Sequence, residues 1–321
     1  MIIREALAQG SADLKYAGIE TPGLDASLLL AHVLNTTRAA LTARATEQLS
    51  EKTCAAFCEL IERRAGGECT AYITGKKEFR GLDFLVNKSV LVPRPDTETL
   101  VEAALEVLSK INNAEAQRHK EINNPGASSE VLNLSARIKV LDLCTGSGAI
   151  AIAIKKEIPI LEIYAADISI KALETAKENA SRLLPNGKID FYHGDLFDAL
   201  KNPFLSSPLI HNVSVPVSEI FSLIVSNPPY IPSGEISSLP AEVQNEPRTA
   251  LDGGENGLDI IKRIIENAPQ YLEKDGVLLL EADPRQMKDI SNLLEKHGYD
   301  NIQLFNDLSG SQRVIGGRYK K

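Results

Sequence analysis

An apolar run of this chain ends abruptly in Asn227-Pro228-Pro229-Tyr230. Two consecutive prolines cannot continue a strand or a helix, because each lacks an amide hydrogen and has a fixed φ. The chain must therefore stop and present Asn227 at the tip of a strand. A side-chain amide oxygen and a neighbouring backbone carbonyl can together accept two hydrogen bonds from a planar NH2 group. The motif indicates a site for an amide or exocyclic amine, although an isolated Asn-Pro-Pro is also typical of an ordinary turn.

A glycine-containing turn lies upstream, between a short apolar strand and an apolar helix. Gly146 and Gly148 allow the backbone to approach a bound ligand, and the amides of the following helix point toward it. Their spacing also fits the dinucleotide fingerprint, so the turn alone leaves two kinds of cofactor open. Asp142, at the strand end just before the turn, suits the ammonium of an amino-acid-bearing cofactor better than a pyrophosphate. A loop-capping role for this carboxylate is equally open.

Two more acidic residues end predicted strands downstream. Asp167 lies about 20 residues past the glycines, where a ribose diol would be bound. Ser169 then begins an amphipathic helix. Asp195 follows a third strand and could accept a hydrogen bond from an adenine amino group. One such acid is most often a turn residue, but three at successive strand ends, with Asn-Pro-Pro-Tyr at a fourth, favour a cofactor site.

This set of motifs resembles the class I S-adenosylmethionine-dependent methyltransferases that act on planar nitrogen. Further motifs narrow the resemblance, over nearly the whole chain, to the release factor glutamine methyltransferases of the PrmC/HemK family. They are Tyr72-Ile73-Thr74-Gly75, Glu78-Phe79-Arg80-Gly81, Pro93-Arg94-Pro95-Asp96-Thr97-Glu98, Glu246-Pro247 and Gly257-Leu258-Asp259.

Two departures from the family pattern stand out. The family usually has Gly-Thr-Gly where this chain has Cys144-Thr145-Gly146, so the cofactor loop loses one glycine. The family often has Glu-x-Gly-x-x-Gln where this chain has Glu281-Ala282-Asp283-Pro284-Arg285-Gln286. We expect this second motif to lie away from the chemistry.

The resemblance implies an α/β fold with a doubly wound, mostly parallel seven-stranded Rossmann-like methyltransferase sheet and an antiparallel final strand. It implies S-adenosyl-L-methionine as cofactor, released as S-adenosyl-L-homocysteine, and no metal. The implied cofactor-binding residues are Asp142, Cys144, Thr145, Gly146, Ser147, Gly148, Asp167, Asp195, Leu196 and Asn227. The implied substrate is the glutamine of the Gly-Gly-Gln loop in class I peptide chain release factors.

The mechanism expected from these motifs is direct methyl transfer to the glutamine amide nitrogen, with Asn227, Pro228 and Tyr230 as catalytic residues. Asn227 Oδ1 and the Pro228 carbonyl would each accept one N–H of the substrate, and both bonds would strengthen as the nitrogen becomes cationic. Tyr230 would pack over the amide plane, while Pro229 would fix the turn. Arg94 is expected to contact the substrate, although a salt bridge within its loop is an equally good account.

The organisation of the chain predicts an N-terminal helical bundle over 1–72 for substrate docking, a β-hairpin linker over 73–92 and a methyltransferase domain over 93–321. The polar stretches 112–135 and 201–218 are predicted to be a mobile insertion and a surface loop.

Composition excludes several classes of protein. The chain has 321 residues, 43% hydrophobic and 24% charged, which is ordinary for a globular protein. No apolar run reaches transmembrane length and the N-terminus lacks a signal pattern, so we expect a cytoplasmic protein without a membrane partner. The four cysteines form no Cys-x-x-Cys pair and the five histidines form no His-Glu-x-x-His, so neither disulfides nor zinc is expected.

Three alternative functions remain. An adenine-N6 or cytosine-N4 nucleic-acid methyltransferase also binds a planar NH2, but it must flip a base and bind phosphates. The formal charge of −8 argues against that, and we expect no stable nucleic-acid partner. A binding protein on a retired methyltransferase fold would not need Asn227 and the strand-end acids. A dinucleotide oxidoreductase would leave Asn-Pro-Pro-Tyr without a role.

Overall fold

The structure is a computed structural model that describes residues 1–122, 138–201 and 220–320. Its chain divides into two compact units. The first comprises Met1–Lys76, Val86–Lys88 and Ser238–Glu246, and the second comprises Lys77–Leu85, Ser89–Ser237 and Pro247–Lys321. The segment expected to be a linker is thus shared between the units, and a segment from far along the chain joins the first.

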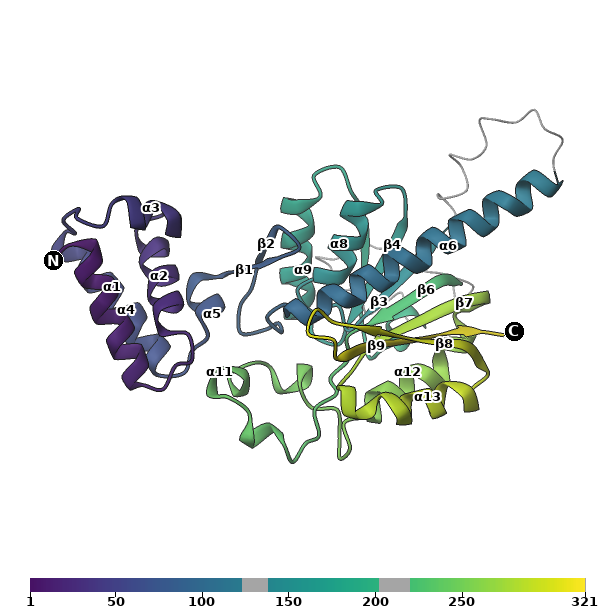
Figure 1. Ribbon diagram of the computed structural model, residues 1–321. Helices are drawn as coiled ribbons and strands as arrows, with labels where there is room; N and C mark the ends of the chain where they lie inside the picture. The colour runs from purple at the N-terminus through teal and green to yellow at the C-terminus, as the bar shows by residue number, and fades with distance from the viewer. Residues whose placement is uncertain (123–137, 202–219, 321) are drawn as a thin grey trace. The chain divides into compact units, whose positions relative to one another are not determined.

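The expected N-terminal helical domain is confirmed (Figure 1). Its helices are α1 (Ile3–Tyr16), α2 (Pro22–Val33), α3 (Arg38–Ala43), α4 (Glu51–Ala65) and α5 (Thr70–Thr74). Side-chain caps define two of the helix starts, because Thr37 accepts a hydrogen bond from the Ala40 amide and Ser50 accepts one from the Thr53 amide. Apolar residues of these helices form a separate core around the fully buried Leu29.

A buried ion-pair cluster explains why Ser238–Glu246 belongs to this first unit. Arg64, near the end of α4, is only 7% exposed in its side chain and pairs at 2.7 Å with Asp25 of α2. Its second partner is Glu242 of α11 (Ala241–Gln244). A buried guanidinium is stable only when its charge and donors are matched, so the carboxylate from α11 completes the site. Asn245 adds a bond of 2.9 Å from its amide nitrogen to the Gly67 carbonyl.

A seven-stranded sheet with the order β5-β4-β3-β6-β7-β9-β8 forms the second unit's centre in the described ranges. Its strands are β3 (Lys139–Leu143), β4 (Glu162–Asp167), β5 (Ile189–His193), β6 (Phe221–Ser226), β7 (Leu272–Glu281), β8 (Tyr299–Asn306) and β9 (Gln312–Tyr319). Strands β3 to β7 pair in parallel, whereas β9 lies antiparallel between β7 and β8. The predicted fold class and the closing antiparallel hairpin are confirmed.

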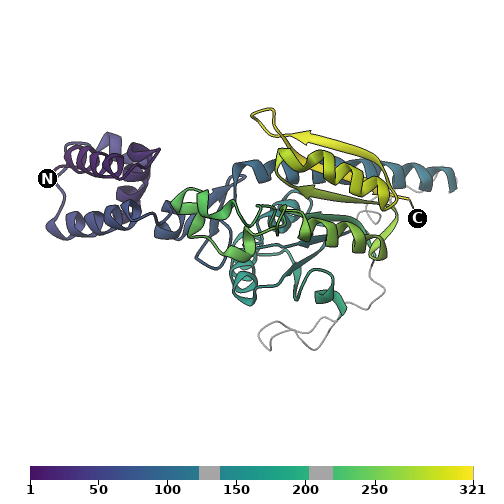
Figure 2. The same cartoon turned by 90° about the horizontal axis from the view of Figure 1, so that it is seen from below.

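Helices cover both faces of this sheet, as Figures 1 and 2 show. One face carries α6 (Glu98–Ile122), α8 (Ala149–Glu157) and α9 (Ile170–Leu183), and the other carries α12 (Asp259–Asn267) and α13 (Met287–Lys296). Adjacent residues of β3 point to opposite faces: Val140 packs into the core beneath α6, α8 and α9, and Leu141 packs into the core beneath α12 and α13. Burial on both faces is why the parallel strands are continuously apolar.

Shorter elements connect these layers. They are the hairpin strands β1 (Lys76–Phe79) and β2 (Leu82–Leu85), the helix α10 (Asp198–Lys201), and the 3-10 turns η1 (Pro95–Thr97), η4 (Ile236–Ser238), η5 (Arg248–Ala250), η6 (Ala268–Gln270) and η7 (Pro284–Gln286). The two-stranded hairpin agrees with the prediction from sequence. Within the described part of the chain, no helix has the length and apolarity needed to cross a membrane.

The prediction for the polar stretch 112–135 is wrong in its first part. Helix α6 continues to Ile122, because the alanine, glutamate, glutamine and lysine residues that follow Asn113 are strong helix formers despite their polarity. Residues 123–135 lie outside the described part of the chain. The second stretch, 201–218, begins at the last residue of α10, and its remainder also lies outside the described residues.

Candidate active site

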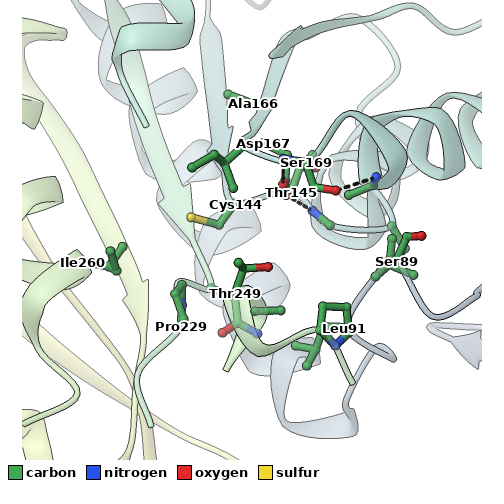
Figure 3. Close-up of a pocket in the computed structure, with 18 of the residues that line it drawn as sticks. Ser89, Leu91, Cys144, Thr145, Ala166, Asp167, Ser169, Pro229, Thr249 and Ile260 are labelled. Carbon is green, nitrogen blue, oxygen red and sulfur yellow. Dashed lines mark hydrogen bonds between the residues drawn. The ribbon is translucent and has the colours of Figure 1, made fainter. Parts of the chain in front are cut away.

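A cavity of about 480 Å³ lies at the carboxyl ends of β3, β4 and β6, within the second unit (Figure 3). The volume is in the range of small-molecule sites, about 300 to 1,000 Å³. Parallel pairing of β3 with both β4 and β6 brings the three strand ends to one edge. The expected cofactor residues that line it are Cys144, Thr145, Gly146, Ser147, Asp167, Asp195, Leu196 and Asn227. Asp142 and Gly148 are not among its lining residues.

The glycine loop and Asp167 form one wall of this cavity. The Asp167 carboxylate accepts hydrogen bonds from the amides of Gly146 at 2.9 Å and Ser169 at 2.8 Å, so it ties the loop to the start of α9. Burial raises the pKa of this carboxyl above its ordinary value. Gly148 has φ +82°, and a Cβ there would lie 3.2 Å from Ala176 Cβ. This glycine therefore permits close packing of the loop against α9, and its contact with a cofactor stays a prediction.

Cys144 occupies the position where the family pattern has glycine. Its φ is +59°, in the left-handed region that costs a residue with a side chain about 1 kcal/mol. Figure 3 shows its sulfur on the side of the cavity that Ile260 of α12 lines. Burial, and then the neighbouring Asp167 carboxylate, raise the pKa of the thiol, so Cys144 is a neutral wall of the cavity.

Asp142 lies below the loop and is fully buried. Its Oδ2 accepts hydrogen bonds from the Thr145 hydroxyl at 2.7 Å and the Ala151 amide at 3.2 Å. Among the described residues Oδ1 has no hydrogen-bond partner, and burial raises the pKa of the carboxyl to about 7. The geometry is that of the loop-capping role left open by the sequence, and contact of Asp142 with a cofactor stays a prediction.

Asp195 also lines the cavity and is paired with a residue that the sequence did not single out. Its Oδ2 accepts a hydrogen bond of 2.7 Å from Arg263 of α12, which also lines the cavity. Leu196 beside it also lines the cavity and has φ +50°. The Asp195 carboxylate has further lone pairs, so it can accept from an adenine amino group while paired with Arg263, and that contact stays a prediction.

Asn227 follows the last residue of β6 and lines the cavity. Its Nδ2 donates a hydrogen bond of 3.2 Å to the hydroxyl of Thr97, which is 4% exposed and belongs to η1. With the nitrogen engaged in this way, Oδ1 is the part of the amide left for a donor in the cavity. Thr97 lies within the Pro-Arg-Pro-Asp-Thr-Glu motif, but no pattern in the sequence indicates that it contacts Asn227.

The other members of the Asn-Pro-Pro-Tyr motif differ in their access to the cavity. Pro229 lines it, whereas Pro228 and Tyr230 are not among its lining residues. Tyr230 packs against the core beneath α12 and α13, and burial raises the pKa of its hydroxyl. Arg94 is partly buried, and its charge acts on this same tyrosine.

The motif from Glu281 to Gln286 lies next to this site, so the expectation that it would be remote is wrong. Gln286 Nε2 donates a hydrogen bond of 2.9 Å to the Tyr230 carbonyl. Glu281 ends β7, directly beside the end of β6. The β6–β7 pairing, which sequence motifs do not reveal, brings the two segments together. No three His, Cys, Asp or Glu side chains in the described ranges are grouped so as to hold a metal ion.

Comparison with known proteins agrees with this architecture. Two family models match, the PrmC N-terminal domain over residues 5–75 and the Methyltransferase small domain over residues 127–214. The catalytic domain of hMettl16, solved in complex with MAT2A 3'UTR hairpin 6, superimposes with a TM-score of 0.51 over 82% of each chain. At 13% identity this similarity concerns the fold alone.

Several curated relatives align over almost the whole chain. The release factor glutamine methyltransferase of Moorella thermoacetica is 35% identical, over 98% of this chain and 98% of its own length. That of Vibrio cholerae is 36% identical, over 99% and 97%. The bifunctional methyltransferase of Rickettsia conorii is 35% identical, but this chain covers only 57% of its length. With full-length relatives at this identity, the chain belongs to the release factor glutamine methyltransferase family.

Proposed function

We propose that this protein methylates N5 of the glutamine in the Gly-Gly-Gln motif of class I peptide chain release factors. The observation that carries the proposal is the amide of Asn227, whose nitrogen is bonded to Thr97 while its oxygen is left for a donor in the cavity. An acceptor so placed can bind the planar NH2 of a glutamine side chain. The names of the full-length relatives support release factors as the source of that glutamine.

S-adenosylmethionine is the proposed methyl donor, and when bound it supplies an electrophilic methyl group on a sulfonium. The residues present fit this molecule. A Cβ added to Gly146 would meet nothing within 4 Å, so the loop leaves space for a ligand. Asp167 and Asp195 line the cavity with carboxylates suited to a ribose diol and an adenine amino group. The loop residues Cys144, Thr145, Gly146 and Ser147 complete the proposed binding surface.

The proposed catalytic role of the protein is to orient a poor nucleophile. An amide nitrogen shares its lone pair with the carbonyl, so it reacts only when it is held in line with the methyl group. Asn227 Oδ1 and the Pro228 carbonyl would each accept one of its N–H groups. As the nitrogen becomes cationic these bonds become charge-assisted, and such bonds are worth about 1.5 to 3 kcal/mol each. The strengthening occurs in the transition state, as catalysis requires.

The remaining residues of the motif would shape the substrate pocket. Tyr230 would pack over the amide plane, Pro229 would fix the turn, and Arg94 would contact the substrate. The burial of Tyr230 keeps its hydroxyl neutral, so it is not a base in this scheme. The cationic methylated nitrogen would then lose its proton to solvent water after transfer.

The first unit is the proposed docking surface for the release factor. Its separate apolar core and its own ion-pair cluster make it a compact body with a surface of its own. Because the proposed substrate is a translation factor, we propose that the activity is cytoplasmic.

The test is transfer of labelled methyl from S-adenosylmethionine to purified release factor and, in parallel, to DNA and RNA. Mass spectrometry then locates the labelled atom. We expect label on the Gly-Gly-Gln glutamine, and loss of turnover in Asn227→Ala with binding of S-adenosylmethionine retained. Asn292→Ala, an exposed change on α13, is the matched control and should behave as wild type.

Three results would contradict the proposal. Label on nucleic acid alone would identify the enzyme as a nucleic-acid methyltransferase. No label on any acceptor, with the cofactor still bound, would indicate another protein substrate or a non-catalytic role. Parallel loss of turnover and cofactor binding in Asn227→Ala would make that residue structural.

A further inference from the structure

Glu281 is a fully buried carboxylate, and neither of its oxygens makes a hydrogen bond of normal geometry among the described residues, although the nearby hydroxyls of Thr97 and Tyr230 favour its charged form. It is the last residue of β7, and the pairing of Ser226 with Leu280 places it beside Asn227 at the ends of two parallel strands. Leaving a buried polar group unpaired carries a large desolvation penalty. Such a group in a folded protein therefore calls for a functional explanation.

Four side chains act on this carboxyl from the elements packed around it. They are Thr97 and Asp96 of η1, Tyr230 after β6, and Arg313 of β9. Burial raises the pKa of Glu281 to about 7, while the Thr97 hydroxyl and Arg313 oppose the rise. Arg313 is itself shared, because it pairs with Asp96 at 3.0 Å and with Asp307 at 3.4 Å. Thr97 is thus the neutral side chain that most favours the charged form of Glu281.

The Thr97 hydroxyl also contacts Asn227, so it has two neighbours, Asn227 and Glu281, but one hydrogen to donate. A hydroxyl donates one hydrogen bond and accepts others. If the Thr97 hydroxyl donates its hydrogen bond to Glu281, its lone pairs accept from Asn227 Nδ2, which is the orientation in the structure. If the Thr97 hydroxyl donates to Asn227 instead, the amide must turn so that Oδ1 accepts this bond, and Nδ2 then points to the cavity. A donor in that place cannot bind the N–H groups of a substrate.

We infer that Glu281 is a positioning residue that acts through Thr97 to keep Oδ1 of Asn227 facing the substrate. This inference rests on the proposed function, because it assigns a purpose to an acceptor at Asn227. Glu281, Thr97 and Asn227 then form a hydrogen-bond relay. Ionised Glu281 can only accept, so the Thr97 hydroxyl donates its hydrogen bond to Glu281 and accepts one from Asn227, which leaves Oδ1 of Asn227 for the substrate. Protonated Glu281 can donate to Thr97, which releases the hydroxyl proton toward Asn227 and favours the unproductive amide orientation.

The relay predicts a specific pH dependence. Activity rises with pH as Glu281 loses its proton, and the buried negative charge is present when the substrate nitrogen becomes cationic. Asp142 also has a pKa raised to about 7, so the pH profile of the wild-type protein alone does not assign the rise in activity near pH 7 to Glu281. Loss of this rise in a Glu281 variant does assign it.

The experiment compares Glu281→Gln, Glu281→Met, Thr97→Val and Thr97→Ser as full chains with release factor as substrate. We expect Thr97→Val to lower kcat by about 10- to 100-fold. This is no more than the loss of about 100-fold or more seen when a direct transition-state contact is removed, because Thr97 acts through Asn227. Thr97→Ser should restore kcat. Glu281→Gln should lose the pH-dependent limb and retain part of kcat because its amide can still accept, while Glu281→Met should lose more.

Three further measurements separate positioning from a structural role. Dissociation constants for S-adenosylmethionine should change by less than about 3-fold, since the relay faces Asn227 and not the glycine loop. Thr175→Val, a matched change at a buried threonine of α9 bonded to the Lys171 carbonyl, should keep wild-type kcat and pH profile. The double variant of Glu281→Gln and Thr97→Val should be no slower than Thr97→Val alone, because both changes break one relay.

The inference and the proposed function fail in different ways. If the wild-type protein labels release factor and the Glu281 and Thr97 variants keep its kcat and pH profile, the inference is overturned and the proposed function stands. If the wild-type protein labels a different planar-amine acceptor, the proposed function is overturned. The same variants measured on that acceptor then decide the inference: loss of kcat with rescue by Thr97→Ser supports it, and unchanged kcat overturns it.

Discussion

Replacement of Glu281 by glutamine should stabilise the protein at alkaline pH. Burial raises the pKa of this carboxyl from 4.5 to about 7. Below pH 4.5 the carboxyl is protonated in both the folded and the unfolded chain, so its ionisation does not change the free energy of unfolding. Between the two values the unfolded chain loses its proton first, and stability falls as pH rises. Above about pH 7 the penalty is complete: about 2.5 units at 1.36 kcal/mol per unit give a cost of about 3 kcal/mol.

Urea unfolding of the wild-type chain and of Glu281→Gln, followed across this pH range, measures the effect. Glutamine does not titrate, so ionisable groups that do not interact with residue 281 cancel in the difference between the two proteins. We expect the free energies of unfolding to be similar near pH 4 and to differ by about 3 kcal/mol near pH 8.5, in favour of the variant. A Glu→Gln change at exposed Glu295 of α13 should give no such pH-dependent difference.

Lower stability of Glu281→Gln than of wild type at every pH would contradict this prediction. It would mean that the favourable contacts of the carboxylate outweigh the cost of burying its charge. A stability gain together with lost activity would show that the buried charge is kept for function at the expense of stability.

Changes at three further positions test other parts of the structure. Cys144→Gly should remove the left-handed strain and raise the free energy of unfolding by about 1 kcal/mol, whereas Cys144→Val should lower it. Thermal unfolding checks this order, and equal stability of the two variants and wild type would contradict the strain. Asp25→Ala should lower the free energy of unfolding by about 3 kcal/mol, because among the described residues it leaves the buried Arg64 with one carboxylate partner, Glu242. A change below about 1 kcal/mol in urea unfolding would count against the cluster. Gly148→Ala should weaken binding of S-adenosylmethionine and lower the melting temperature, since its Cβ would press on α9 at positive φ; unchanged calorimetric affinity would contradict this.

The sequence motifs predicted the fold class, through the resemblance to a known family, and the edge of the sheet that carries the proposed chemistry. Apolar runs that each end in a polar residue, as at Asp167 and Asn227, predict parallel strands whose carboxyl ends meet at one edge. Two prolines after Asn227 stop the chain there whatever surrounds them. The antiparallel closing hairpin and the N-terminal helices also followed from sequence patterns. These features are local, so short stretches of sequence are enough to specify them.

The side chains that act on the Asn-Pro-Pro-Tyr motif became apparent from the three-dimensional contacts. Thr97 reaches Asn227 across 130 residues of sequence, and Glu281 arrives beside it through the pairing of β6 with β7. The partnership of Asp195 with Arg263 has the same origin. Ser238–Glu246 joins the first unit because a buried guanidinium needs its carboxylate. Such contacts depend on strand order and helix placement, and burial then sets the charge of each group, so no local pattern in the sequence reports them.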